Sequence, residues 1–280
     1  MNDQQDRNPG TRPILNALGA QMAGKVLTLS TMVWFVAITV GQAVFAAYIA
    51  LFYGGATVRG DLNAWNEVIP GRVVDGDAVG FIAIAAHLVL AFVVTAIGPF
   101  QLVPGLRAKL PKLHHWMGRT YLAAGYAISL GGLFLIWGHR DADDTLLGSA
   151  PLTLNALLII IFATMALKNA MGRRIDLHRQ WALRLFMAMS GVWFLRVLIM
   201  VWVVSLGTDG LGARLEGPVG TFLKFACYAF PLVVLELYVA ARRATLPLLR
   251  WLMAAVILGL TALMGTGIVM ATMALWLPHM

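Results

Sequence analysis

The first long apolar stretch of the chain, residues Leu27 to Tyr53, reads LTLSTMVWFVAITVGQAVFAAYIALFY and contains no charged side chain. A helix needs about 20 predominantly apolar residues to cross the hydrocarbon core of a bilayer. This stretch is long enough for one crossing. The sequence therefore predicts a membrane-spanning helix at these residues.

The rest of the chain has the same character. Of its 280 residues, 60% are apolar and only 12% are charged, which excludes an ordinary soluble domain. Six further stretches have the length and apolar character of a crossing: Val79 to Val103, His115 to Gly138, Leu152 to Leu167, Trp181 to Leu206, Thr221 to Ala240 and Leu248 to Leu277. We therefore predict an all-α, polytopic membrane bundle of seven transmembrane helices.

The charged residues predict how this bundle is oriented. Lys and Arg are retained in short loops on the cytoplasmic side of a membrane, and here they precede the first helix and fill the second, fourth and sixth loops, while most Asp and Glu lie in the alternate loops. The N-terminus is then cytoplasmic and the C-terminus periplasmic. The net charge of +8 follows from this topology and from attraction to anionic lipid headgroups, so it does not indicate nucleic-acid binding.

Two regions follow from this topology. Residues 1–26 are expected to form a cytoplasmic segment with a short interfacial helix, because Ile14, Leu15, Leu18 and Met22 recur at helical spacing. Residues 27–280 then form a single seven-helix domain. The lone cysteine, Cys227, excludes an internal disulfide and a thiolate-bound iron–sulfur cluster.

Two short runs combine His, Trp and Arg at a helix entry on the predicted cytoplasmic side. They are LHHWMGRTY at Leu113 to Tyr121 and DLHRQWALRLF at Asp176 to Phe186. Two helices that present neutral imidazoles at equal depth can hold a b-type haem, with Arg side chains near its propionates. The iron ligands would be His178 and either His114 or His115, and the spacing does not choose between the last two. The flanking residues would be Arg119, Arg184, Trp116 and Trp181.

A simpler interpretation applies to the same residues. A membrane interface selects Trp at headgroup depth and Arg that extends towards phosphates. Interfacial anchoring alone could therefore account for both runs. A metal ion or a quinone headgroup is a further alternative.

His87 and Arg196 are predicted in the outer halves of the second and fifth helices. An ionisable group at that depth must face protein or a water-filled cavity. The two residues could hold an anionic group or a quinone oxygen, or Arg196 could form a purely structural polar pair. Since no second histidine pair is predicted near the outer face, the chain can bind at most one haem.

Glu236 and Arg184 are predicted at similar depth on the sixth and fifth helices. A salt bridge between them is favoured over proton transfer, because either charge alone would be expensive to remove from water. Pro231 is expected to kink the sixth helix. Gly118, Gly125 and Gly132 form one stripe on the third helix, which indicates close helix packing more than clearance for a cofactor.

The stretch GPFQLVPGLRAKLPKLHHWMGRTYL, followed by DLHRQWALRLF and then Arg196 and Glu236, resembles a bacterial multi-pass membrane family known as domain of unknown function 2306. The resemblance covers about Phe81 to Arg243. It implies a shared site in which His114, not His115, is the partner of His178, although His115 replaces the usual basic residue of the family. Leu232 replaces an Asn expected beside Pro231, so the resemblance does not imply that the backbone of the predicted sixth helix takes part in the site. The resemblance implies no activity.

Together these features predict a protein of the bacterial inner membrane with a polar site near its cytoplasmic side. The first hypothesis is a redox protein that binds one haem b through His114, Arg119, His178 and Arg184 and exchanges electrons with a quinone. The alternative is a transporter or receptor for a small anionic or lipid-like ligand that His87, Arg196 and Glu236 contact. A third is a structural subunit of a larger membrane complex.

Overall fold

The fold is given by a computed structural model, which describes residues 11–69, 73, 76–138, 146–212 and 215–280, with side chains from residue 18 onward. Within these ranges the chain forms helices and no strand, as predicted. The helices are α1 (Thr11–Ile49), the π-helix η1 (Ala50–Gly54), α2 (Gly55–Arg59), the 3-10 helix η2 (Leu62–Glu67), α3 (Ala78–Gln101), α4 (Pro104–Lys109), α5 (Pro111–Trp137), α6 (Leu146–Met171), α7 (Ile175–Met189), α8 (Gly191–Leu206), α9 (Pro218–Arg243), α10 (Pro247–Ala271), the π-helix η3 (Thr272–Trp276) and the 3-10 helix η4 (Leu277–His279).

In the part of the chain that the structure describes, six helices are long and apolar enough to cross a membrane, and there are seven candidate crossings when the bent pair of α7 and α8 is counted as one span. The predicted all-α membrane bundle is therefore confirmed, with six to seven candidate crossings. The fifth crossing differs from the prediction, because Trp181 to Leu206 is not one straight helix. It breaks at Ser190, where the axes of α7 and α8 differ by 52°.

The helix starts follow from local sequence. Asp77 precedes α3 and its Oδ1 accepts a hydrogen bond of 2.8 Å from the backbone N–H of Gly80. Proline is the first residue of α4, α5, α9 and α10, where its missing N–H costs no helical hydrogen bond.

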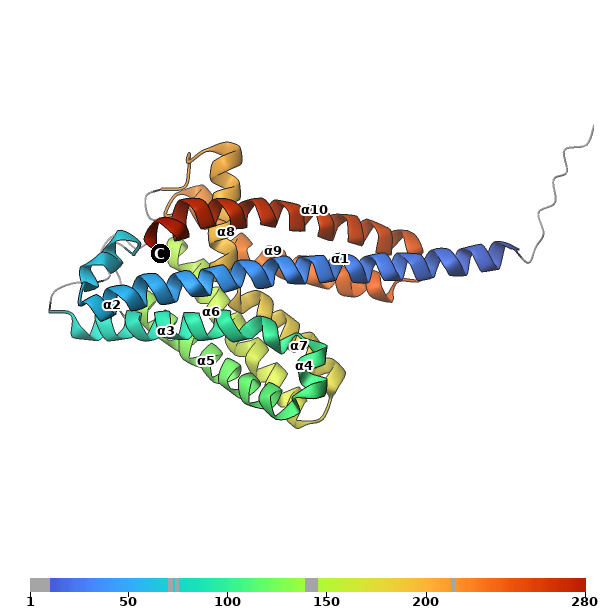
Figure 1. Cartoon of the computed structure of the whole chain (residues 1–280), viewed down its shortest axis with the longest axis horizontal. Helices are drawn as coiled ribbons and strands as arrows, with labels where there is room; N and C mark the ends of the chain where they lie inside the picture. The colour runs from blue at the N-terminus through green and yellow to red at the C-terminus, as the bar shows by residue number, and fades with distance from the viewer. Residues whose placement is uncertain (1–10, 70–72, 74–75, 139–145, 213–214) are drawn as a thin grey trace, which may run out of the picture.

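Figure 1 shows α1 (blue) as the longest helix, with α3, α5, α6 and α7 on one side of it and α10 on the other. α1 packs against α3 and α10, and α8 packs against α9 and α10. The loops that carry most Lys and Arg, around α4, at the α6–α7 turn and at the α9–α10 turn, gather at one end of the bundle, which we call the basic end. The opposite end, with η2 and the C-terminus, is called the acidic end.

α1 begins at Thr11 and continues past Leu27 without a break. The segment predicted as a separate short helix is therefore the first part of α1. Its place on the membrane surface and the cytoplasmic position of the basic end stay predictions. Residues 1–10 lie outside the described residues.

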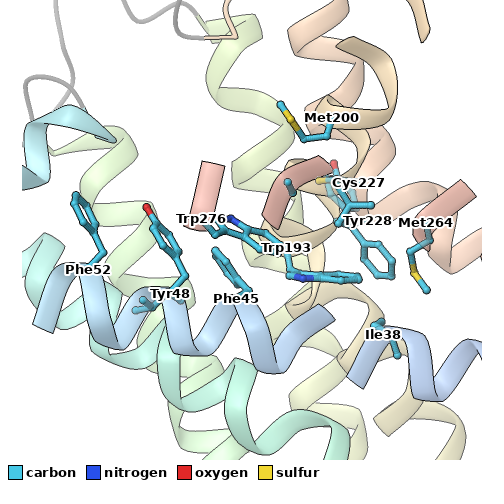
Figure 2. Close-up of a cluster of buried hydrophobic side chains, with 14 of the residues drawn as sticks. Ile38, Phe45, Tyr48, Phe52, Trp193, Met200, Cys227, Tyr228, Met264 and Trp276 are labelled. Carbon is cyan, nitrogen blue, oxygen red and sulfur yellow. The ribbon is translucent and has the colours of Figure 1, made fainter. Parts of the chain in front are cut away.

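The largest buried cluster is aromatic and lies along the second half of α1. Figure 2 shows Phe52, Tyr48 and Phe45 in a row on this helix, with Trp193 of α8 and Trp276 of η3 beside them. The π-helices η1 and η3 lie where α1 and α10 approach the acidic end, and both contribute aromatic side chains to the cluster. π-helical turns are rare and are often found at functional sites.

The glycine stripe of α5 is a packing surface, as predicted. A Cβ atom at Gly118 would lie 3.2 Å from Oε1 of Gln101, and one at Gly125 would lie 3.3 Å from Sδ of Met189. At Gly132 a Cβ would lie 3.7 Å from Cε1 of His87. Side chains of α3 and α7 therefore reach the α5 backbone along this stripe.

Candidate functional site

The two His, Trp and Arg runs begin α5 and α7 at the basic end, and each has the same local geometry. In each run the Arg follows the Trp by three residues, so the two side chains share a helix face. The guanidinium of Arg119 lies 5.6 Å from the ring centre of Trp116, and that of Arg184 lies 4.8 Å from that of Trp181. Both pairs are within the distance of a cation–π interaction.

The histidines of the runs lie near one another. The Nδ1 atom of His178 is 3.0 Å from the backbone carbonyl of Ala166 on α6. The rings of His114 and His115 are 6.1 Å apart, and His178 is close enough for its charge to act on His114. The Nδ1 atom of His114 is buried without a hydrogen-bond partner. No three His, Cys, Asp or Glu side chains converge on one point in the described ranges.

Arg184 forms a two-point ion pair with Glu236 of α9, with Nε–Oε1 and Nη2–Oε2 distances of 2.7 and 2.9 Å. The predicted salt bridge is confirmed. It is partly open, since the side chain of Glu236 is 50% exposed and that of Arg184 19%. Its parallel, two-bond geometry is the strong form of an Arg–carboxylate contact, and it joins α7 to α9.

A cavity of about 330 Å³ lies between α1, α7, α8, α9 and α10. Its walls on α8 are Phe194, Val197, Leu198 and Val201, and those on α7 are Leu183 and Met187. The cavity thus has lining residues on both sides of the break at Ser190, so the 52° bend shapes its wall. Its volume falls within the range of small-molecule sites, about 300 to 1,000 Å³.

The cavity is apolar except on the side nearest the basic end of the bundle. Arg242 is the charged residue among those that line it, and its Nη1 donates a hydrogen bond of 3.3 Å to the hydroxyl of Tyr238. Pro231 also lines the cavity, although α9 continues unbroken through it. Sequence reasoning missed Tyr238 and Arg242. They share one face of α9 with Pro231, Val234 and Leu235, and this helical spacing could have indicated that they line the same surface.

The break between α7 and α8 brings buried polar groups together. Nε2 of Gln42 donates a hydrogen bond of 2.8 Å to Oγ of Ser190, and a Cβ at Gly191 would lie 3.0 Å from Nδ2 of Asn155. Oε1 of Gln42 and Oδ1 of Asn155 are buried without partners. Sequence reasoning missed this break, although a Ser–Gly pair inside an apolar run is a known site of helix kinks.

Arg196 lies in the interior of α8, about 15 Å along the helix from its end at Leu206. Its Nη1 donates a hydrogen bond of 3.1 Å to the carbonyl of Val192, and its guanidinium lies 4.9 Å from the ring centre of Phe45. His87 is close enough for the charges of the two residues to interact, and its Nδ1 is buried without a partner. Joint binding of a ligand by His87 and Arg196 stays a prediction.

The predicted site residues therefore form two groups. Five of them lie at the basic end, as counting from the helix ends predicted: His114, His178, Arg119, Arg184 and Glu236. The other two, His87 and Arg196, lie deeper in the bundle. Their roles in binding stay predictions. The cavity is a third feature, and none of these seven residues lines it.

Comparison with curated proteins and with solved structures finds no match. The sequence profile of the family described as "Predicted membrane protein (DUF2306)" matches residues 84–238. The matched region is more than half of the 280 residues and contains both histidine runs, Arg196 and Glu236. It confirms the resemblance inferred from those residues, and the chain belongs to the DUF2306 family of predicted membrane proteins.

Proposed function

We propose that the protein binds an amphipathic acid, a molecule with an apolar tail and one acidic group, inside the membrane bundle. The observation that supports this function best is the cavity of about 330 Å³. Its walls are almost entirely apolar and suit a hydrocarbon tail. Arg242 and Tyr238 at its basic end offer one positive charge and a phenol beside it.

The charge pattern favours an acid over a neutral lipid. Arg242 has its hydroxyl partner in Tyr238, but no carboxylate lies within ion-pair distance of it among the described residues. A ligand carboxylate or phosphate would pair with this exposed guanidinium through charge-assisted hydrogen bonds. The role of the protein would then be that of a transporter or receptor for this ligand. We expect it to act in a bacterial inner membrane with the basic end in the cytoplasm.

Binding of oleate and of oleyl alcohol to the purified protein tests this function, because the two probes share a tail and differ in charge. We expect tighter binding of oleate, and we expect Arg242→Ala to remove the preference, a loss of about tenfold for one charged hydrogen bond. Arg243→Ala is the matched control, since Arg243 is the next residue but does not line the cavity. Equal binding of both probes by the wild type, or a preference that survives Arg242→Ala, would contradict the proposal.

A second candidate is the binding of one haem b between His114 and His178, and one contact favours it. An Nδ1–H of His178 that donates to the Ala166 carbonyl leaves Nε2 with a free lone pair, which is how metal-binding histidines are usually oriented. Bound haem would supply one-electron transfer, with Arg119 and Arg184 near its propionates. The protein expressed with ample haem should show a Soret absorption band that His178→Ala abolishes and His115→Ala retains. A colourless wild type would refute this candidate.

A further inference from the structure

Arg196 is a positive charge inside the bundle, on α8. Among the described residues no carboxylate lies within ion-pair distance of it. Its contacts are one carbonyl of its own helix and the face of Phe45, with Tyr48 and Tyr53 near enough to act on its charge. A guanidinium has five N–H donors, so most of its hydrogen-bonding capacity is unused.

Two further donors without acceptors lie around the Phe45 ring that Arg196 faces. The indole nitrogens of Trp193 and Trp276 are buried without partners, and these side chains are only 2% and 1% exposed. Figure 2 shows both indoles next to Phe45, the ring that the guanidinium of Arg196 faces. The ring centres of Phe45 and Trp276 are 5.3 Å apart. An indole N–H can only donate.

The packing holds these donors in place. A Cβ at Gly41 would lie 2.6 Å from Cζ2 of Trp193, so this indole is pressed against the α1 backbone. Trp276 is placed by the π-helix η3, in which the turn is wider than in an α-helix. Arg196 retains accessible surface, whereas the two tryptophans are fully enclosed. The packing thus fixes unpartnered N–H donors on two indoles around the ring that the Arg196 guanidinium faces.

We propose that Arg196, Trp193 and Trp276 form a second binding site, which takes one oxyanion, a carboxylate or a phosphate. A cation would be repelled by Arg196, and a neutral ligand would leave its charge uncompensated. The site is independent of the proposed amphipathic-acid function, because none of the three residues lines the cavity. The oxyanion can belong to a soluble molecule or to a lipid headgroup.

The test is calorimetric binding and thermal stability of the full-length protein in neutral micelles at constant ionic strength. Inorganic phosphate and acetate represent soluble anions, and phosphatidylglycerol against phosphatidylcholine represents a lipid headgroup. We expect at least one anionic probe to bind and raise the melting temperature. Binding of phosphate or acetate indicates a soluble ligand. Binding of phosphatidylglycerol without binding of phosphate or acetate indicates a lipid headgroup.

Variants assign the binding to this site. Arg196→Met should weaken it about 30-fold or more, as expected when one partner of a buried charged contact is removed. Trp276→Phe keeps an aromatic ring and all charges, and it should weaken binding about fivefold through one lost hydrogen bond. Arg179→Met is the matched control, because Arg179 pairs with Asp176 at the basic end.

Three results would overturn the site. They are the absence of any response of the wild type to the anionic probes, a response that Arg196→Met retains in full, and equal weakening by Arg179→Met. The cavity variant Leu260→Trp should leave this binding unchanged, so failure of this site and failure of the cavity function can be told apart.

Discussion

Arg184 lies on α7 and Arg196 on α8, the two helices that meet at the break at Ser190, and their surroundings differ. Arg184 has a two-point ion pair with Glu236 and lies over the ring of Trp181. Arg196 lies over Phe45 and has no described carboxylate partner. The first arginine is satisfied by the fold and joins two helices. The second has no carboxylate partner among the described residues, and in our proposal it is a binding charge where the first is a structural one.

The largest difference in stability is expected between variants that lack Arg184 and variants that lack Arg196. Arg184→Met leaves the Glu236 carboxylate uncompensated, and we expect a loss of about 2 kcal/mol in the free energy of unfolding, less than for a fully buried pair because Glu236 is half exposed. Arg196→Met removes an uncompensated charge and should stay within about 1 kcal/mol of the wild type. Unfolding in mixed micelles without added anion measures both. An equal loss in the two variants would remove the distinction.

A double-mutant cycle sharpens the structural side of the comparison. Arg184→Met, Glu236→Gln and the double variant should give a coupling energy of about 1.5 kcal/mol, because the contact is bidentate and charge-assisted. The measurement is again the free energy of unfolding in mixed micelles. A coupling energy near zero would show that the two-point pair does not stabilise the protein.

The break between the two arginines depends on a hydrogen bond from a distant part of the chain. Gln42→Leu removes the donor to Ser190 and should cost about 1 kcal/mol of unfolding free energy. Thr39→Val is the control on the same helix, since the Thr39 hydroxyl donates to the Phe35 carbonyl one turn earlier on α1 itself. If both substitutions have the same effect, the contact with Ser190 does not hold the break.

The smallest effect is expected at the tryptophans that face the basic-end arginines. Trp181→Phe should cost about 0.5 kcal/mol of unfolding free energy, because Trp181 faces Arg184 and also packs on Phe162. Trp116→Phe should have no measurable effect, since Trp116 is 67% exposed. A larger effect at Trp116 would indicate that this run has a structural role equal to that of the second run.

Much of this architecture could be predicted from sequence. The apolar length of a helix, and the position of a charged residue along it, are both local properties of the chain. Apolar length located the candidate crossings, and counting from helix ends located Arg184 and Glu236 at one level, which their ion pair confirms. The family was also recognisable, since the His, Trp and Arg runs are local motifs within the matched region.

The break and the cavity could not be predicted in the same way, because they depend on contacts between distant segments. Ser190 is bonded by Gln42, which lies 148 residues earlier in the chain. The cavity is built by short patches from five helices, none of which has a distinctive sequence alone. Arg242 resembles any other arginine of a basic loop until the fold places it at the cavity.

The central claim is that the bundle holds an amphipathic acid in the cavity lined by α8 and α10, and native mass spectrometry of the purified protein tests it most directly. Leu260→Trp fills the cavity, whereas Leu258→Trp adds the same ring on the exposed face of α10. We predict that the wild type and Leu258→Trp retain oleate in a one-to-one complex and that Leu260→Trp does not. Equal retention of oleate by all three proteins, or by none, would contradict the account.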